Sequence, residues 1–134
     1  MLDTNVVLDV LQARPGFVDY AVAVFDMIEH NAITGLLCAT TITTLAYLAG
    51  KAVGKAQAIR QIRELLALFE VAPVTRAVLD GALKSKALDF EDAVLAEAAL
   101  LAGANAIITR KLRDFAHSSV RAHTPAQWVA MRSR

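Results

Sequence analysis

The sequence contains very little cysteine, and Cys38 is the only one among its 134 residues. A single thiol excludes an internal disulfide bond and a zinc site built from cysteines. We expect this side chain to fill core space in a protein of a reducing compartment. Repeats, low-complexity segments and linkers are missing as well, and the length supports one substantial core. The sequence therefore predicts a single domain over residues 1–134.

Neither sign of charge is in excess. The chain has 14 lysines and arginines and 13 aspartates and glutamates, which gives a formal net charge of +1 at pH 7. Bulk electrostatics of this kind do not indicate a nucleic-acid-binding protein. A polyanion would therefore have to be bound by a local basic patch.

Long apolar segments are also absent. The longest, AVLAEAALLAGANAII, contains Glu97, Gly103 and Asn105, and it falls short of the roughly 20 apolar residues that a membrane span requires. At the N-terminus, Asp3 and Asp9 stand where a secretory signal peptide needs a basic region and an apolar core. The sequence predicts a cytoplasmic protein with no membrane partner.

Short apolar segments alternate with segments of helical periodicity. The threonine cluster 40–44 offers N-caps for one of the helices. The expected helices cover residues 5–13, 17–30, the segment from 40–44 to 52, 59–69, 78–83 and 89–103, with a last one from 124. The expected strands or strand ends lie in 32–39, 71–74, 106–109 and near 120. Because parallel strands need crossover connections, the alternation predicts an α/β fold with a parallel sheet flanked by helices.

Three aspartates are expected at one edge of this sheet. Asp3 follows a very short first strand, Asp114 follows the strand at 106–109, and Asp92 lies in the first turn of the helix before that strand. Ligand sites of such sheets lie beyond the carboxyl ends of the strands. Clustered carboxylates repel one another, and a hard divalent cation relieves the repulsion, so the cluster predicts Mg²⁺ or Mn²⁺. Such an ion supports phosphodiester cleavage.

Each acid also has a plainer interpretation. Asp89 is expected to cap the helix 89–103, and neighbouring acids could do no more than complement the helix dipole. Asp114 could simply start a turn. Asp9 and Asp26 are expected to be solvated helix residues.

Four motifs together resemble the PIN-domain nucleases of the VapC-type toxin group. They are LDTNVVLD at the start, DFEDAVLAEAALLAGANAIITR late in the chain, then RDF and a closing TPAQW. The resemblance implies a three-layer sandwich, with a short parallel sheet between helices on both faces. It implies a metal-dependent endoribonuclease that leaves a 3′-hydroxyl and a 5′-phosphate. It also implies a homodimer and a cognate antitoxin that inserts into the active-site groove.

The resemblance assigns roles to individual residues. By position in the motifs, Asp3, Asp92 and Asp114 correspond to the catalytic acids that hold the metal. Thr109 corresponds to a polar position that lines the same site. Asn5 corresponds to a residue that supports the first acid.

The sequence departs from the family pattern at two positions. Tyr47, in TLAYL, stands where many members have a glutamate, and a neutral phenol is a poor Mg²⁺ ligand. Either Glu91 or Asp89 could supply the missing acidity, and Glu91 is preferred because Asp89 is needed as a cap. Lys111 stands where relatives often have Asn or Asp, and it either contacts the scissile phosphate or points to solvent.

Basic residues near the acids are needed to offset their repulsion of RNA. We expect Arg110 and Arg113 to contact phosphates. Five other cations either border the groove or are ordinary solvated charges, namely Arg14, Lys51, Lys55, Arg60 and Arg63. The apolar faces of the helices expected at 17–30 and 59–69 are candidates for a homodimer interface.

Other classes of protein fit less well. A receiver domain needs an Asp about 45 to 50 residues after the first strand, but none lies between Asp26 and Asp80. A phosphatase with a nucleophilic Asp needs a second Asp where Asn5 stands. The alternative that remains is a catalytically weakened PIN-like module that binds RNA or a protein, with Tyr47 marking the loss of activity.

Overall fold

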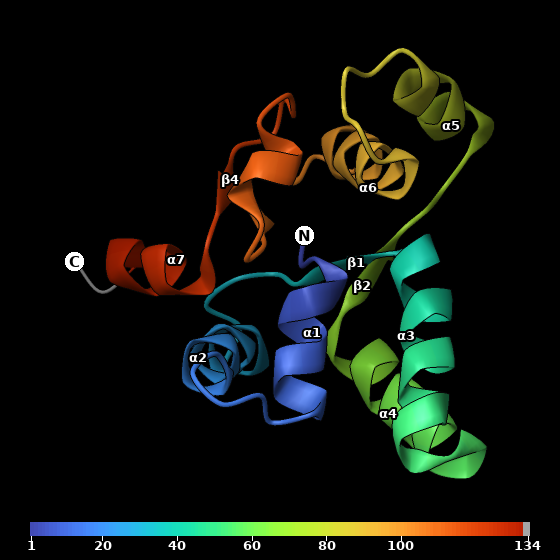
Figure 1. The fold of residues 1–134 in the computed structure, drawn as a ribbon. Helices are drawn as coiled ribbons and strands as arrows, with labels where there is room; N and C mark the ends of the chain where they lie inside the picture. The colour runs from blue at the N-terminus through green and yellow to red at the C-terminus, as the bar shows by residue number, and fades with distance from the viewer. Residues whose placement is uncertain (133–134) are drawn as a thin grey trace.

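The computed structural model describes residues 1–132, which form seven α-helices, one 3-10 helix and four short strands (Figure 1). In chain order these are α1 (Thr4–Leu11), α2 (Val18–Glu29), β1 (Leu36–Cys38), α3 (Ala39–Val53), α4 (Lys55–Leu68), β2 (Glu70–Ala72), α5 (Arg76–Leu83), α6 (Phe90–Leu101), β3 (Ile107–Ile108), η1 (Leu112–Phe115), β4 (Ala122–His123) and α7 (Pro125–Arg132). None of these helices is both long and apolar enough to cross a membrane.

All strand pairing is parallel within the described residues, as the alternation of elements predicted. Strand β1 pairs with β2, and β3 pairs with β4. The N-terminal segment lies between the two pairs, because the Leu2 amide donates to the Leu36 carbonyl at 3.0 Å and the Ile108 amide donates to the Met1 carbonyl at 2.8 Å. The expected first strand is therefore reduced to a single parallel bridge between Leu2 and Ile108.

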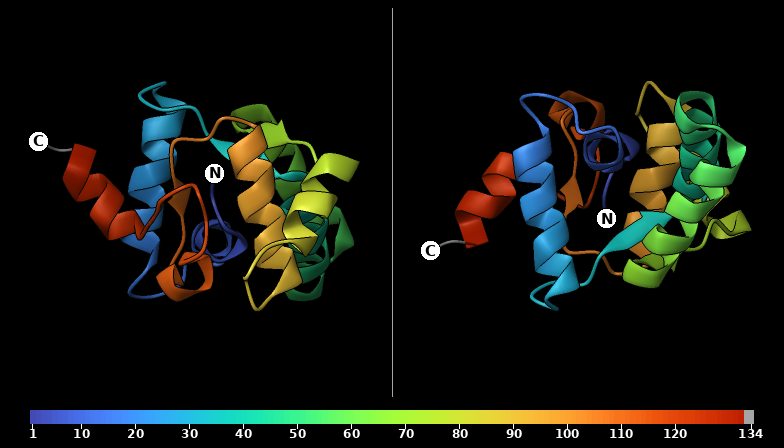
Figure 2. Two further views of the ribbon diagram at one scale, coloured as in Figure 1. Left: turned by 90° about the horizontal axis from the view of Figure 1, so that it is seen from above. Right: turned by 90° about the horizontal axis from the view of Figure 1, so that it is seen from below.

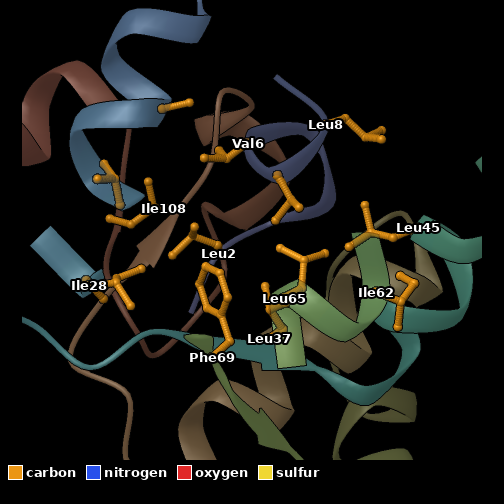
Figure 3. Packing of buried hydrophobic residues seen from close by; sticks show 14 residues of the cluster. Leu2, Val6, Leu8, Ile28, Leu37, Leu45, Ile62, Leu65, Phe69 and Ile108 are labelled. Atoms are coloured by element: carbon orange, nitrogen blue, oxygen red, sulfur yellow. The ribbon is translucent and has the colours of Figure 1, made fainter. Parts of the chain in front are cut away.

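Both faces of this strand layer are covered by helices. Successive strand residues point to opposite faces, so Leu37 and Ile108 enter one apolar cluster while their neighbours Cys38 and Ile107 enter another. The first cluster packs under α1, α2 and α4, with Phe69 close to Leu2 at its centre (Figure 3). The second cluster takes more of its residues from α6 than from any other element. Two views at right angles to Figure 1 place the N-terminus between α2 and α6 (Figure 2), as expected for a three-layer sandwich.

The two ends of α6 are explained by the residues that occupy them. Asp89 is the N-cap of α6, as predicted, since its Oδ1 accepts from the Asp92 amide at 2.9 Å. Gly103 lies just beyond the end of α6 at a φ of 74°, a conformation that favours glycine. The threonine N-cap predicted for α3 is wrong, because β1 runs directly into the helix and Cys38 occupies the cap position. Thr41 is instead buried within α3.

Candidate active site

Five carboxylates from three parts of the chain line one cavity of about 650 Å³. They are Asp3, Asp89, Glu91, Asp92 and Asp114. Asp3 begins α1, Asp114 lies in η1, and the other three belong to the N-terminal end of α6. The three aspartates singled out in the sequence therefore share one pocket.

Asp3 is held firmly by hydrogen bonds. It is the N-cap of α1 and is 7% exposed, and its Oδ1 accepts from the Thr4 amide at 2.8 Å. Its Oδ2 accepts from the Thr109 hydroxyl at 2.8 Å and from the Asn5 side-chain amide at 3.1 Å. Burial raises the pKa of Asp3, while the bonds from Thr109 and Thr4 and the charge of Lys111 oppose that rise. The carboxylate is thus positioned by neighbours that favour its charged form.

Asp92 is the most strongly perturbed acid of the cavity. Desolvation, followed by the negative charges of Asp3, Asp89, Asp114 and Glu91, raises its pKa to about 7. Because each of these carboxylates contributes, the cavity concentrates negative charge at Asp92. A perturbed acid in a cleft is typical of a functional site.

Glu91 is tied to α3 by Thr44, whose hydroxyl donates to Glu91 Oε1 at 3.2 Å. Thr44 also lines the cavity, a role that no sequence pattern indicated. Tyr47 is one turn further along α3, is 62% exposed and lies under the Lys51 ammonium, 4.6 Å from the ring centre. It is not among the residues that line the cavity. The side chain that faces the acids from α3 is therefore Thr44.

The donor chemistry of the cavity fits a hard divalent cation. Its five acids supply carboxylate oxygens, which Mg²⁺ and Mn²⁺ prefer, and a dication would offset the negative charges that, after desolvation, add to the raised pKa of Asp92. As the side chains are placed, no three His, Cys, Asp or Glu residues within 1–132 form a group that could hold an ion. The acids share one cavity without forming a closed set of ligands.

The segment after β3 is fixed to the same acids. Thr109 is fully buried, and its hydroxyl accepts from the Lys111 amide at 3.0 Å while donating to Asp3. The Arg110 amide donates to Asn5 Oδ1 at 3.3 Å. These bonds connect α1 to the loop that leads into η1 and Asp114.

The expectation that Asp9 is a solvated helix residue is wrong. Asp9 is 0% exposed, and Arg110 Nε lies 2.9 Å from its Oδ2 while Arg110 Nη2 donates to its Oδ1 at 3.2 Å. The Arg110 guanidinium also stacks on Phe17, 4.0 Å from the ring centre. Arg110 lines the cavity, but its charged group faces the buried carboxylate.

Of the other cations named from the sequence, some line the acidic cavity and some do not. Lys111 and Arg113 line the acidic cavity and a second hollow of about 530 Å³ beside it. Arg14 also lines the acidic cavity. Lys51, Lys55, Arg60 and Arg63 do not. His117, which sequence reasoning missed, adds a titratable side chain to the wall.

The cavity, the parallel strands and the two helical layers together define an α/β domain with an acidic site at the end of its strand layer. This chain belongs to the PIN domain family, whose model matches residues 1–113. The membership of the PIN domain family that the motifs suggested is thereby confirmed. A search of curated proteins gave no significant match.

Solved structures of low identity share the fold. A toxin–antitoxin complex from Klebsiella pneumoniae matches with a TM-score of 0.70 and 21% identity, over 92% of this chain and 95% of that chain. VapBC2 from Rickettsia felis, bound to a DNA fragment from its promoter, matches with a TM-score of 0.75 and 15% identity, over 92% and 96%. FitAB bound to a DNA fragment matches with a TM-score of 0.67 and 22% identity, over 92% and 93%. The predicted α/β fold class is therefore confirmed.

Proposed function

We propose that this PIN domain is an Mg²⁺- or Mn²⁺-dependent endoribonuclease. The observation that carries the proposal is that Asp3, Asp92 and Asp114 line one cavity, where desolvation and then the charges of the neighbouring acids raise the pKa of Asp92. These three residues would hold the metal, and Glu91 would serve as an outer or additional ligand. When bound, such an ion polarises a phosphoryl oxygen and activates water for attack on phosphorus.

The protein's own residues prepare the site for a phosphodiester. Thr109, Asn5 and the Thr4 amide fix the orientation of Asp3 and use three of its about four acceptor positions, so Oδ1 keeps a lone pair for a metal ion. Lys111 partly offsets the negative charge of Asp3. Together with Arg113, Lys111 offers positive charge to the phosphates of an RNA strand entering the cavity.

A weakened PIN-like module that binds RNA or a protein is the second candidate. One observation favours it, namely that the acids do not stand as a closed set of ligands. Tyr47 does not support it, because that side chain does not line the cavity. The two candidates differ in whether a divalent ion produces cleavage.

We further propose that the protein is a cytoplasmic toxin controlled by a cognate antitoxin and that it forms a homodimer. The support is that the structures sharing its fold include a toxin–antitoxin complex and VapBC2. Apolar side chains on α2 and α4 are exposed and suit a contact between subunits. They are Tyr20, Val22, Ile59 and Leu66.

Incubation of the purified protein with a mixed pool of structured RNA tests the proposal. We expect cleavage with Mn²⁺, none with a chelator, and none from Asp92→Asn under either condition. Glu64→Gln, an exposed change on α4 outside the cavity, is the matched control and should cleave as the parent does. Equal cleavage by the parent and Asp92→Asn, or no metal-dependent cleavage by the parent, would contradict the proposal.

A further inference from the structure

Two arginines share one buried carboxylate at the edge of the acidic cavity. Arg110 contacts both oxygens of Asp9, at 2.9 and 3.2 Å, and Arg14 Nη1 lies 3.6 Å from Oδ1 of the same residue. One carboxylate balances the charge of only one guanidinium. The group therefore retains one positive charge.

The contacts assign that remaining charge to Arg14. Two nitrogens of Arg110 contact Asp9, and one face of its guanidinium group is covered by Phe17. An ion pair at 2.9 Å together with a hydrogen bond at 3.2 Å is the stronger contact, whereas a single approach of 3.6 Å is longer than a hydrogen bond. Arg110 is therefore the ionic partner of Asp9, and Arg14 is only a neighbour.

Arg14 is also held in position without being neutralised. Its Nε and Nη2 donate to Gln12 Oε1 at 3.1 and 3.0 Å, and this acceptor carries no charge. Its amide donates to the Asp9 carbonyl at 3.1 Å, which fixes the turn after α1. The side chain is 35% exposed and lines the cavity that contains Asp3 and Asp92. A cation fixed in this way has little side-chain entropy left to lose on binding.

We propose that Arg14 binds a backbone phosphate of the RNA strand on the α1 side of the carboxylates, and that Arg110 serves as the structural partner of Asp9. This inference rests on the proposed ribonuclease function. A polyanion that approaches five carboxylates needs a positive charge that no carboxylate already balances, and Arg14 provides it on this wall. Lys111 and Arg113 provide positive charge from the segment after β3.

RNA binding measured at several salt concentrations tests the inference. The probe is the labelled pool of structured RNA, and the background is Asp92→Asn in Mg²⁺, so that binding is observed without cleavage. We expect Arg14→Gln to weaken binding about tenfold. It should also reduce the slope of log affinity against log salt by about 0.7 to 0.9, as expected for the loss of one phosphate contact. Arg14→Lys, which keeps the charge, should keep the slope of the parent.

The matched control is Arg60→Gln, which removes one positive charge from α4 outside the cavity and should leave the slope unchanged. A thermal unfolding curve for each variant shows that the comparison is made between folded proteins. If the background protein binds RNA and Arg14→Gln keeps the parental slope, or if Arg60→Gln loses as much, the inference is wrong while the proposed function stands. If the background protein binds no RNA, the proposed function itself fails.

Discussion

The hydroxyl of Thr109 donates a hydrogen bond of 2.8 Å to Asp3 Oδ2, across 106 positions of sequence. Both residues are buried, and the bond joins the end of β3 to the first turn of α1. A second bond from the Lys111 amide to the Thr109 hydroxyl extends this connection toward η1. One hydroxyl group thus joins Asp3 to the segment that leads to Asp114.

Replacement of this hydroxyl by a methyl group should weaken both the fold and the site. Thr109→Val keeps the shape of the side chain but removes one of the three hydrogen bonds to Asp3 and leaves the Lys111 amide without its acceptor. We expect the free energy of unfolding in urea to fall by about 1–3 kcal/mol, the cost of an unsatisfied buried group. The bond lowers the pKa of Asp3, so its loss should move the acid limb of RNA cleavage to higher pH.

Thr109→Ser is the matched control, because it retains the donor and acceptor. Its pH profile should coincide with that of the parent, although the lost methyl group costs some stability. An unshifted acid limb in Thr109→Val, with the protein folded, would show that the bond does not tune Asp3.

Removal of the buried carboxylate of Asp9 should lower the free energy of unfolding more than Thr109→Val does. Asp9→Leu leaves Arg110 without its ionic partner, and we expect a loss of about 3 kcal/mol in the free energy of unfolding. The double variant Asp9→Leu with Arg110→Met should recover much of that loss, because an apolar pair can replace a buried ion pair. Asp26→Leu, at an exposed position on α2, is the control and should change stability little. Equal losses in the single and double variants would contradict this account.

The features that the sequence predicted correctly depend on short-range chemistry. Asp89 is a cap because its side chain reaches an amide only three residues away. The strand at 106–109 and the helix before it are marked by a continuous apolar run and a glycine stop. The order of these elements is sufficient to predict the parallel pairing and the edge at which the acids gather.

The features that it missed depend on partners far along the chain. The partner of Asp9 is 101 positions away, and α1 is so central that Asp9 is buried together with Val6, Val7 and Leu8. The eight residues of α1 have no clear polar face in their sequence pattern, so the pattern does not show that Asp9 is buried. Thr44 joins the site only because α3 packs against α6.

The stability of the metal-free protein should fall as pH rises through the range in which Asp92 ionises. Its pKa is about 7 in the folded protein and near 3.8 when unfolded, so the folded state binds more protons between these values. Linkage then requires the free energy of unfolding to decrease from about pH 4 to pH 7 and to level off above. Thermal unfolding with a chelator present checks this trend.

Asp92→Asn should flatten the pH dependence in that window and be the more stable protein at pH 8, because no charge is forced into the acidic cavity. Glu64→Gln, an exposed acid on α4, should give a curve parallel to that of the parent. Parallel curves for the parent and Asp92→Asn would show that Asp92 carries its charge without penalty.

Addition of Mn²⁺ should reverse this loss of stability. An ion that binds only the folded protein stabilises it by about 2.7 kcal/mol at one hundred times its dissociation constant. We expect a rise of several degrees in the melting temperature at pH 7.5 and a smaller rise at pH 5.5, where protons compete for Asp92. Asp3→Asn and Asp92→Asn should lose the response, whereas Glu64→Gln should keep it. An equal rise in all four proteins would indicate binding elsewhere.

A glutamate introduced at position 47 tests whether the tyrosine found there, where many family members have a glutamate, has removed a metal ligand. If this position faced the metal, Tyr47→Glu would restore a missing ligand and raise both Mn²⁺ affinity and cleavage. Because Tyr47 is 62% exposed and outside the cavity lining, we expect the cleavage rate to stay within about twofold of the parent, as for an ordinary surface change. Thr44→Val should instead slow cleavage, since it releases Glu91. A large gain in cleavage rate for Tyr47→Glu, with no effect of Thr44→Val, would show that position 47 and not Thr44 faces the acids from α3.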